Sequence, residues 1–410
     1  MNDTGSPEGH ASVGTRRAGA REGSGPPEEL ARRYRSEFPI FDRKIYLNSN
    51  SLGALSRRSI EARRTFERQW NRMGAGAWYG PWLEKLDEVR AGFGRTVGAG
   101  AGSVALVPSV SAGLTAVADA LDFGDRDTVV VSELDFPTLL YQFLARRRSG
   151  LRVEVVQSPD GVEVPPERWV EAVDERTALV ATSHVFFTTG AIQDAGALAR
   201  IAHDSGALFL LDAYQSNGQI PIDVEAIGAD FLLSGALKWL LGGPGLAYLY
   251  VRPGLVEELE PRSLSWFGVE NQFAFDPAGA TPRPDARRFE MGTPAVGAAF
   301  TAAGGLEIVE EVGIEAIRAR NASLTEDLLR RLREAGFGLR VAPSAERRSA
   351  VVLVRHPEPE AAVRRLADRG IVVDARPGHV RISPHFYNTS EDGERVVAAL
   401  REHREEGGQR

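Results

Sequence analysis

The most constraining feature of the sequence is the alternation, from about Pro39 to Asp230, of short β-branched runs with amphipathic helical stretches. The runs that indicate strands are Val104–Val107, Thr128–Ser132, Leu151–Val156, Ala178–Ser183 and Ala207–Asp212, with Leu246–Val251 as one more strand after a Gly-rich turn. Helical patterns between them cover Ala112–Leu121, Thr138–Arg148, Pro166–Val173 and Asp194–Ser205. Continuous apolar strands that alternate with helices are typical of a mostly parallel sheet covered on both faces. The sequence therefore predicts an α/β fold.

The pattern changes in the last third of the chain. A helical tract over Ala295–Gly336, with a break expected near Val312–Gly313, precedes two further strands. These strands lie at Val351–Val354 and His379–Ser383, and the helix Glu360–Arg369 separates them. This order indicates a smaller α+β domain at the C-terminal end.

These patterns divide the chain into four parts. We expect a disordered tail at 1–28, an N-terminal arm or part of the small domain at 29–82, a large α/β domain at 83–293 and a small α+β domain at 294–410. The tail is expected to be disordered because it is rich in Gly, Ser, Pro and charge. A large domain beside a smaller one leaves a cleft between them, which is a common location for ligand sites.

Composition excludes several classes of function. The net charge of −7 and the pI near 5.7 argue against nucleic acid or an anionic membrane as a partner. The sequence has no cysteine, which excludes a disulfide scaffold, a thiolate metal site and a persulfide carried on the enzyme. No apolar run approaches the roughly 18 residues that span a bilayer, and no hydrophobic segment follows Arg16 and Arg17 as an export signal requires. We expect a soluble cytoplasmic protein without a metal site.

Three candidate polar groups stand where predicted strands end, the usual location of sites in open α/β sheets. They are Asp212, Lys238 and the turn Ser109–Gly113. The turn opens a helix whose first backbone N–H groups could cradle a phosphate. Ordinary helix capping explains its hydroxyls equally well.

Asp212 and Lys238 together indicate a cofactor site more strongly than either residue alone. Asp212 ends an almost wholly apolar strand, where a carboxylate needs a partner such as a protonated pyridine nitrogen; a helix cap or a structural ion pair is the alternative. Lys238 lies between a predicted buried strand and the Gly-rich turn Leu241–Gly245. Apolar neighbours would lower its pKa and favour imine formation, whereas a surface lysine lying over apolar side chains is the alternative. The combination predicts that Lys238 holds pyridoxal 5′-phosphate (PLP) as a Schiff base.

Eight segments carry a family resemblance that runs from about Ile45 to His403. They are IYLNSNSLG (45–53), SELDFPTLLY (132–141), SHVFFTTGAIQD (183–194), DAYQSNGQIPIDV (212–224), SGALKWLLGGPGLAYLYV (234–251), SWFGVENQFAFDP (265–277), FEMGTP (289–294) and RISPHFYNTSED (381–392). They resemble the class V aminotransferase superfamily of fold type I PLP enzymes. Within it, the sequence is most similar to kynureninases and to cysteine desulfurase/selenocysteine lyase-like proteins. The resemblance implies a mostly parallel sheet of the seven-stranded type.

The resemblance also implies a role for each matching position that would hold the cofactor. Lys238 forms the Schiff base and Asp212 pairs with the pyridine nitrogen. Gln215 donates a hydrogen bond to the phenolic oxygen, and Phe136 stacks on the ring, as aromatic packing on a flat heterocycle suggests. Further cofactor-binding residues, most of them at the phosphate, are Val110, Ser111 and Thr138, and also Trp266 and Thr293 from the other subunit of a homodimer.

For the substrate, the resemblance implies Arg381 and Asn50. Arg381 would clamp the α-carboxylate of an amino acid, a task suited to the bidentate guanidinium group. Small-molecule amino acids are thus the expected partners, beside a second copy of the chain.

Several positions depart from the family pattern. Leu237 stands where kynureninases usually have Tyr and desulfurases His, and Phe186 replaces the usual Asn after Ser-His-Val. Gln215 matches desulfurases, whereas Phe136 matches kynureninases. The persulfide-carrying cysteine of desulfurases is absent. The sequence is therefore a hybrid of the two activities.

Three functions stay open from the sequence. The first is cleavage at the β-carbon of an L-amino acid, either kynureninase-like hydrolysis or C–S/C–Se lysis that releases the sulfur product to solution. The second is transamination or epimerisation. The third is a PLP-fold protein kept for binding without catalysis, against which the presence of Lys238, Asp212 and Arg381 argues. In the catalytic cases Lys238 moves the Cα proton.

Overall fold

A computed structural model describes residues 27–407 of the chain. The expected disordered tail lies outside these residues, except for its last two positions. Pro27 and Glu28 instead begin helix α1 (Pro27–Tyr34), so the predicted tail extends two residues too far along the chain. Glu28 is held by Arg320 at 3.1 Å, a contact with a distant helix that local composition does not reveal.

Seven strands form the central sheet, in the order β2-β8-β7-β6-β5-β3-β4. Their bounds are β2 (Val104–Val107), β3 (Thr128–Ser132), β4 (Arg152–Val156), β5 (Thr177–Ser183), β6 (Leu208–Asp212), β7 (Phe231–Gly235) and β8 (Ala247–Val251). Every strand runs in the same direction except β8, which is antiparallel to both of its neighbours. The predicted, mostly parallel α/β sheet is confirmed.

Helices cover both faces of this sheet, because the strand side chains are apolar on both sides. On one face lie α4 (Val110–Ala120), α5 (Pro137–Leu144) and α9 (Pro253–Glu258). On the other face lie α3 (Pro81–Thr96), α6 (Pro166–Ala172), α7 (Ala195–Asp204), α8 (Val224–Ile227) and α10 (Val296–Val312). Alternating residues of one strand, such as Leu210 and Leu211, therefore belong to separate cores.

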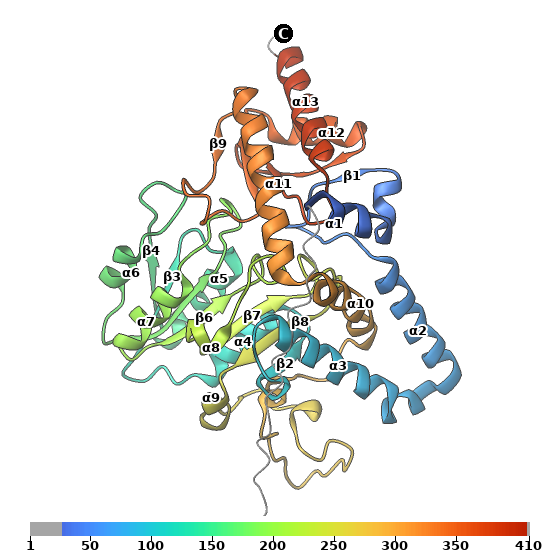
Figure 1. Cartoon of the computed structure of the whole chain (residues 1–410). Helices are drawn as coiled ribbons and strands as arrows, with labels where there is room; N and C mark the ends of the chain where they lie inside the picture. Colours follow the sequence, from blue (N-terminus) through green and yellow to red (C-terminus); the bar gives the residue numbers. More distant parts are fainter. Residues whose placement is uncertain (1–26, 408–410) are drawn as a thin grey trace, which may run out of the picture.

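A second, smaller sheet lies at the far end of α11 (Ile314–Glu334), the long helix that rises from the central layer in Figure 1. Its four antiparallel strands follow the order β12-β13-β10-β9. Their bounds are β9 (Leu339–Arg340), β10 (Val352–Arg355), β12 (Asp374–Arg376) and β13 (His379–Ile382), and α12 (Pro359–Asp368) and α13 (Ser390–Gly407) pack on them. The expected break in the helical tract is confirmed at Gly313.

The N-terminal arm joins this smaller sheet. Strand β1 (Ile45–Tyr46) pairs in parallel with β11 (Ile371–Val372), far away in sequence. Ile45 shares a core with α11, α12 and α13. Farther on, α2 (Arg57–Met73) packs against α10 and lies at the edge of the molecule in Figure 1. These contacts agree with an arm that belongs partly to the small domain, whose exact boundaries stay a prediction.

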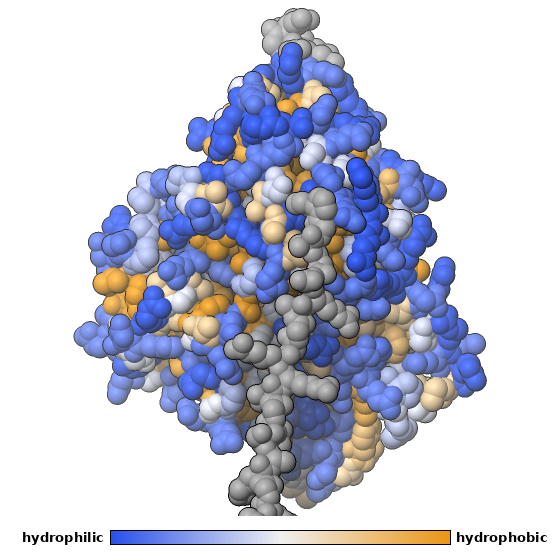
Figure 2. All heavy atoms as spheres, in the orientation of Figure 1, coloured by the Kyte–Doolittle hydropathy of each residue, from blue (hydrophilic) through white to orange (hydrophobic). Residues whose placement is uncertain are grey.

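Short 3₁₀ helices complete the described chain. They occur at Arg35–Glu37, Pro39–Asp42, Gly74–Tyr79, Ala101–Ser103, Arg147–Ser149, Trp266–Gly268 and Ala286–Phe289. Hydrophilic residues cover most of the face drawn in Figure 2. Within residues 27–407, we find no helix with the length and apolar character needed to cross a bilayer.

Candidate active site

The candidate site lies at the carboxyl edge of the central sheet, where three neighbouring parallel strands end. Ser183 at the end of β5 pairs with Asp212 at the end of β6, and Lys238 follows the end of β7 by three residues. Asp212 is buried, and its Oδ1 accepts the backbone N–H of Tyr214 at 2.8 Å. Its other oxygen has no hydrogen-bond donor among the residues described. Burial raises the pKa of Asp212, while the Tyr214 N–H and the charge of Lys238 oppose that rise.

The Lys238 amine rests among aromatic rings. Its Nζ lies 4.2 Å from the ring centroid of Tyr214 and 5.9 Å from that of Phe136. Desolvation lowers the pKa of Lys238 to about 8, against the opposing charge of Asp212 and with help from Arg381 and a further arginine, Arg376. A lysine that sheds its proton near neutral pH is a better nucleophile toward an aldehyde.

The loop that carries Lys238 is held by the N-terminal arm. The N–H of Gly53 donates to the carbonyl of Leu237 at 2.8 Å. A Cβ on Gly53 would overlap the carbonyl oxygen of Lys238, so the close approach requires glycine. Leu237 thus contributes its backbone carbonyl to the site. Among the described contacts, no other polar side chain takes the place of the Tyr or His expected at this position.

Gln215 and Asn50 form a buried polar cluster beside this loop. The Nε2 of Gln215 donates to the carbonyl of Asn50 at 3.0 Å, and its Oε1 accepts the indole N–H of Trp239 at 3.0 Å. Asn50 accepts a hydrogen bond from Ser383, but its Nδ2 is buried with no acceptor in the described part of the chain. A buried donor without a partner is costly, so Asn50 Nδ2 marks a place for a ligand. Gln215 keeps one N–H for the predicted bond to the cofactor.

Arg381 is wholly buried and already paired. Its Nε and Nη2 donate to the carboxylate of Asp374 at 2.9 and 2.6 Å, and Nη2 also donates to Ser51 at 2.8 Å. Its Nη1 donates to the carbonyl of Phe187 at 3.0 Å, which leaves one N–H of that nitrogen for a ligand. The predicted clamp on a substrate carboxylate therefore requires either this remaining N–H or displacement of Asp374.

Asp374 was not predicted as a site residue, although its spacing from Arg381 could have indicated it. It lies directly opposite Arg381 in the β12–β13 hairpin, seven residues earlier in the chain. Arg376, on the same strand, lies 3.3 Å from the Asp374 carboxylate. Its charge compensates Asp374 and leaves the charge of Arg381 available to a substrate anion.

The predicted phosphate residues lie at the starts of two helices. Ser109 caps α4 by accepting the N–H of Ala112 at 3.1 Å, and Val110 and Ser111 form the first turn, partly exposed. The helix begins two residues before the expected Ala112, because the cap is Ser109. Thr138 lies in the first turn of α5, directly after Phe136 and Pro137. Their roles stay predictions.

The matching family is Aminotransferase class-V, over residues 55–396. The chain belongs to the class V aminotransferase family. The uncharacterized aminotransferase YcbU of Bacillus subtilis (strain 168) is 34% identical over 365 residues, covering 89% of this chain and 96% of the relative. A kynureninase of Deinococcus radiodurans is 32% identical over 386 residues, covering 89% and 91%. The solved apo cysteine desulfurase of Thermococcus onnurineus NA1 has a TM-score of 0.83 at 24% identity, covering 92% and 98%.

Membership of the class V family makes the chain a PLP-dependent enzyme of fold type I, as the residues around Lys238 predicted. Those residues fit the cofactor. The unpaired oxygen of Asp212 suits a protonated pyridine nitrogen, and the Lys238 amine, which has no acceptor among the described residues, suits the cofactor aldehyde. Phe136 leaves 45% of its surface exposed beside that amine, enough to cover a flat ring.

Two class V positions lie away from Lys238 in this chain. Trp266 contacts Phe273 and Phe275 in the irregular segment between α9 and α10, and Thr293 is exposed at the end of that segment. No interaction within residues 27–407 joins either of them to Lys238. Their predicted contact with a phosphate therefore requires a second subunit and stays a prediction.

The departure at Phe186 is explained by packing. Phe186 is fully buried in the core on the α3 side of the sheet, and its N–H donates to the carbonyl of Ala191. Its neighbour Phe187 turns toward the site, where its ring meets Phe136 edge-on at 5.2 Å. Phe187 and Tyr214 are site residues that the sequence analysis missed, because a ring in a short polar motif carries no sign of which way it points.

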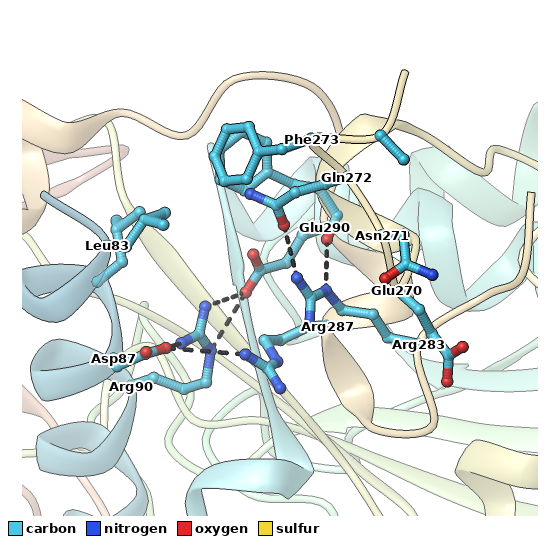
Figure 3. Close-up of a pocket in the computed structure, with 13 residues that line it drawn as sticks. Leu83, Asp87, Arg90, Glu270, Asn271, Gln272, Phe273, Arg283, Arg287 and Glu290 are labelled. Atoms are coloured by element: carbon cyan, nitrogen blue, oxygen red, sulfur yellow. Dashed lines mark hydrogen bonds and ion pairs between the residues drawn. The ribbon is translucent and has the colours of Figure 1, made fainter. Parts of the chain in front are cut away.

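A separate cavity of about 370 Å³ lies between α3 and the segment that follows Trp266 (Figure 3). It contains none of the predicted site residues. Each of its three guanidinium groups has a side-chain partner: Arg90 pairs with Glu290 at 2.7 Å, Arg283 with Gln272 at 2.6 Å, and Arg287 with Asp285 at 2.6 Å.

Proposed function

We propose that this PLP-dependent enzyme cleaves an L-amino acid at its β-carbon. The observation that carries the proposal is the desolvated Lys238 amine beside the buried Asp212, with Arg381 of the smaller sheet reaching the carbonyl of Phe187 nearby. The nearly full-length similarity to kynureninases supports β-cleavage over other reactions of the family.

Each residue of the candidate site would have a separate role in this reaction. When bound, PLP supplies an electron sink that stabilises negative charge on the substrate Cα. Asp212 would hold the pyridine nitrogen in its protonated form, which keeps that sink effective. Lys238 Nζ would take the Cα proton and return it to the product. Arg381 and Asn50 would orient the substrate through its carboxylate, and Phe136 would exclude water from the reacting centre.

Two versions of β-cleavage fit the chain. One is hydrolysis of a carbon–carbon bond, as the kynureninase relatives suggest. The other is lysis of a carbon–sulfur or carbon–selenium bond. Because the sequence has no cysteine to carry a persulfide, that product would leave the site free in solution.

We propose that two copies of the chain form a homodimer with shared active sites. Trp266 and Thr293 would then reach the phosphate of the partner. The segment is suited to such a contact, because Phe275 is 69% exposed and lies in it, and Tyr79, 73% exposed, contacts its Phe273. Sedimentation of the holoenzyme tests this, and a monomer that carries full activity contradicts it. A cytoplasmic location also stays a prediction.

A panel of L-amino acids, incubated with the PLP-loaded full chain, tests the proposed reaction. β-Cleavage predicts release of alanine, or of pyruvate and ammonia, without any keto acid acceptor. A second candidate, transamination, is favoured by the name of the Bacillus subtilis relative, and it predicts turnover only when a keto acid is present. Exclusive dependence on a keto acid would overturn β-cleavage in favour of transamination.

A further inference from the structure

Tyr214 makes contact with both ionisable groups at the centre of the site. Its ring face lies under the Lys238 Nζ, 4.2 Å from the ring centroid, and its backbone N–H donates to Asp212 Oδ1. Phe136 is the other ring near this amine, but it lies farther away at 5.9 Å. The Lys238 amine thus meets an aromatic face where a hydrogen-bond acceptor would be expected for an ammonium group.

Gly235, at the end of β7, makes this placement possible. A Cβ at this position would overlap the ring carbons Cε2 and Cζ and the hydroxyl oxygen of Tyr214. The φ of Gly235 is not in the left-handed region, so backbone conformation does not demand glycine here. The absence of a side chain therefore serves the ring, which occupies the space directly over the strand end.

We propose that Tyr214 is a catalytic residue whose ring face holds the Lys238 amine as an ammonium during proton transfer. The proposal rests on the role of Lys238 in the proposed function. While a substrate is bound, the free Lys238 amine would carry the proton that it takes from Cα. An aromatic face attracts an ammonium electrostatically and leaves a neutral amine almost unaffected. The ring thereby keeps the protonated Nζ at one place until the proton is returned.

The charge state of Tyr214 suits this task. Burial and the nearby charge of Asp212 raise the pKa of its hydroxyl to about 12, so the ring stays a neutral phenol over the working pH range. Desolvation alone disfavours the ammonium form of Lys238. The ring and the charge of Asp212 together offset that effect.

The test measures the proton affinity of Lys238 directly. The full chain is freed of PLP, and the fraction of Lys238 acylated by a brief pulse of acetic anhydride is followed against pH by mass spectrometry of its peptide. Tyr214→Leu keeps an apolar side chain but removes the ring face, and we expect its midpoint to fall by about 0.5 to 1.5 pH units. Tyr214→Phe keeps the ring face, and its midpoint should equal that of the unmodified chain.

Gly235→Ala is the second probe, because it displaces the ring without removing it. Its midpoint should move in the same direction as that of Tyr214→Leu. Tyr141→Leu, an exposed tyrosine on α5, serves as the matched control and should change nothing. Circular dichroism verifies that each variant is folded. A midpoint in folded Tyr214→Leu or Gly235→Ala that is unchanged or higher overturns the proposal, as does a shift in Tyr214→Phe.

This outcome is independent of which reaction the enzyme performs. If the amino-acid panel shows transamination while the midpoints shift as expected, the proposed function fails and the role of Tyr214 stands. If the panel shows β-cleavage and the midpoints do not move, the proposed function stands and the role of Tyr214 is refuted.

Discussion

The carboxyl edge of the central sheet and the cavity of Figure 3 are both rich in charge, yet they differ in how that charge is satisfied. In the cavity, Arg90 and Glu290 are both buried and bonded to each other, and Glu290 also accepts the N–H of Leu106. At the sheet edge, Asn50 Nδ2 has no acceptor and Lys238 Nζ rests on a ring. The buried pair in the cavity is complete without a ligand, whereas the groups at the candidate site retain hydrogen-bonding capacity that a ligand could use.

The sharpest test of this comparison is Lys238→Ala. We expect loss of the visible absorbance of bound PLP and a fall in activity of at least about a thousandfold, because both the cofactor attachment and the proton carrier are lost. Absorbance and product assays measure the two effects. Lys85→Ala, on α3, where the lysine pairs with Glu88, is the matched control and should retain both. Survival of the absorbance in Lys238→Ala would refute the assignment.

Arg90→Met tests the other region. It leaves Glu290 buried without its cation, which costs about 3 to 5 kcal/mol of unfolding free energy. Chemical denaturation followed by circular dichroism measures this loss. Activity per folded molecule should stay the same, since the cavity is separate from Lys238. A variant with normal stability and reduced activity would mean that the cavity is functional.

Two buried histidines predict how stability depends on pH. Burial lowers the pKa of His184, next to Asp212 in the site, to about 4, and that of His385, packed on Trp239, to about 3. Both remain neutral when folded but take up protons when unfolded below about pH 6.5. The free energy of unfolding is therefore highest above pH 6.5. It decreases as the pH falls toward 4, by roughly 1 kcal/mol per pH unit for each histidine.

Urea unfolding between pH 7 and pH 4 measures this slope. His385→Asn should flatten it, because one of the two proton-accepting groups is gone. An unchanged slope in this variant would show that His385 is already protonated in the folded protein.

The smallest expected effect belongs to Asn50→Ala. Removal of its unpaired donor should raise the KM for the amino acid roughly tenfold, because the substrate loses one hydrogen bond in a buried site. Asn71→Ala, which removes an exposed amide on α2, is the matched change and should leave the KM unaltered. Equal effects of the two changes would show that the unpaired donor of Asn50 has no role in substrate binding.

Elements set by local pattern could be predicted from the sequence. Strands β2 and β3 were placed to the residue, and β4 to β6 and β8 to within one residue, because buried apolar runs end abruptly at polar turns. Helix α13 was missed, since its sequence is largely charged and only a narrow face packs on the small sheet. The β1–β11 pair was missed because nothing local indicates a partner that lies hundreds of residues away.

The candidate site also combines features that local sequence predicts with features that depend on distant contacts. Asp212 and Lys238 could be proposed from the sequence because Asp212 ends one apolar strand and Lys238 follows another. The contact of Tyr214 with Lys238 could not, because it depends on Gly235 leaving space on a different strand. The occupation of Arg381 by Asp374 depends on hairpin register, which the sequence analysis did not assign. The contributions expected of Trp266 and Thr293 need a second subunit and stay predictions.

The grip of Gly53 on the Lys238 loop has a consequence for the order in which a new chain matures. The arm that carries Gly53 is synthesised before the central sheet, but it is anchored by β11 and by the bridge from Asn48 to Ser383, which are synthesised after it. Pairings this distant in sequence close late. The central sheet can thus form first, and the cofactor loop acquires its final shape only after β11 and Ser383 have emerged from the ribosome.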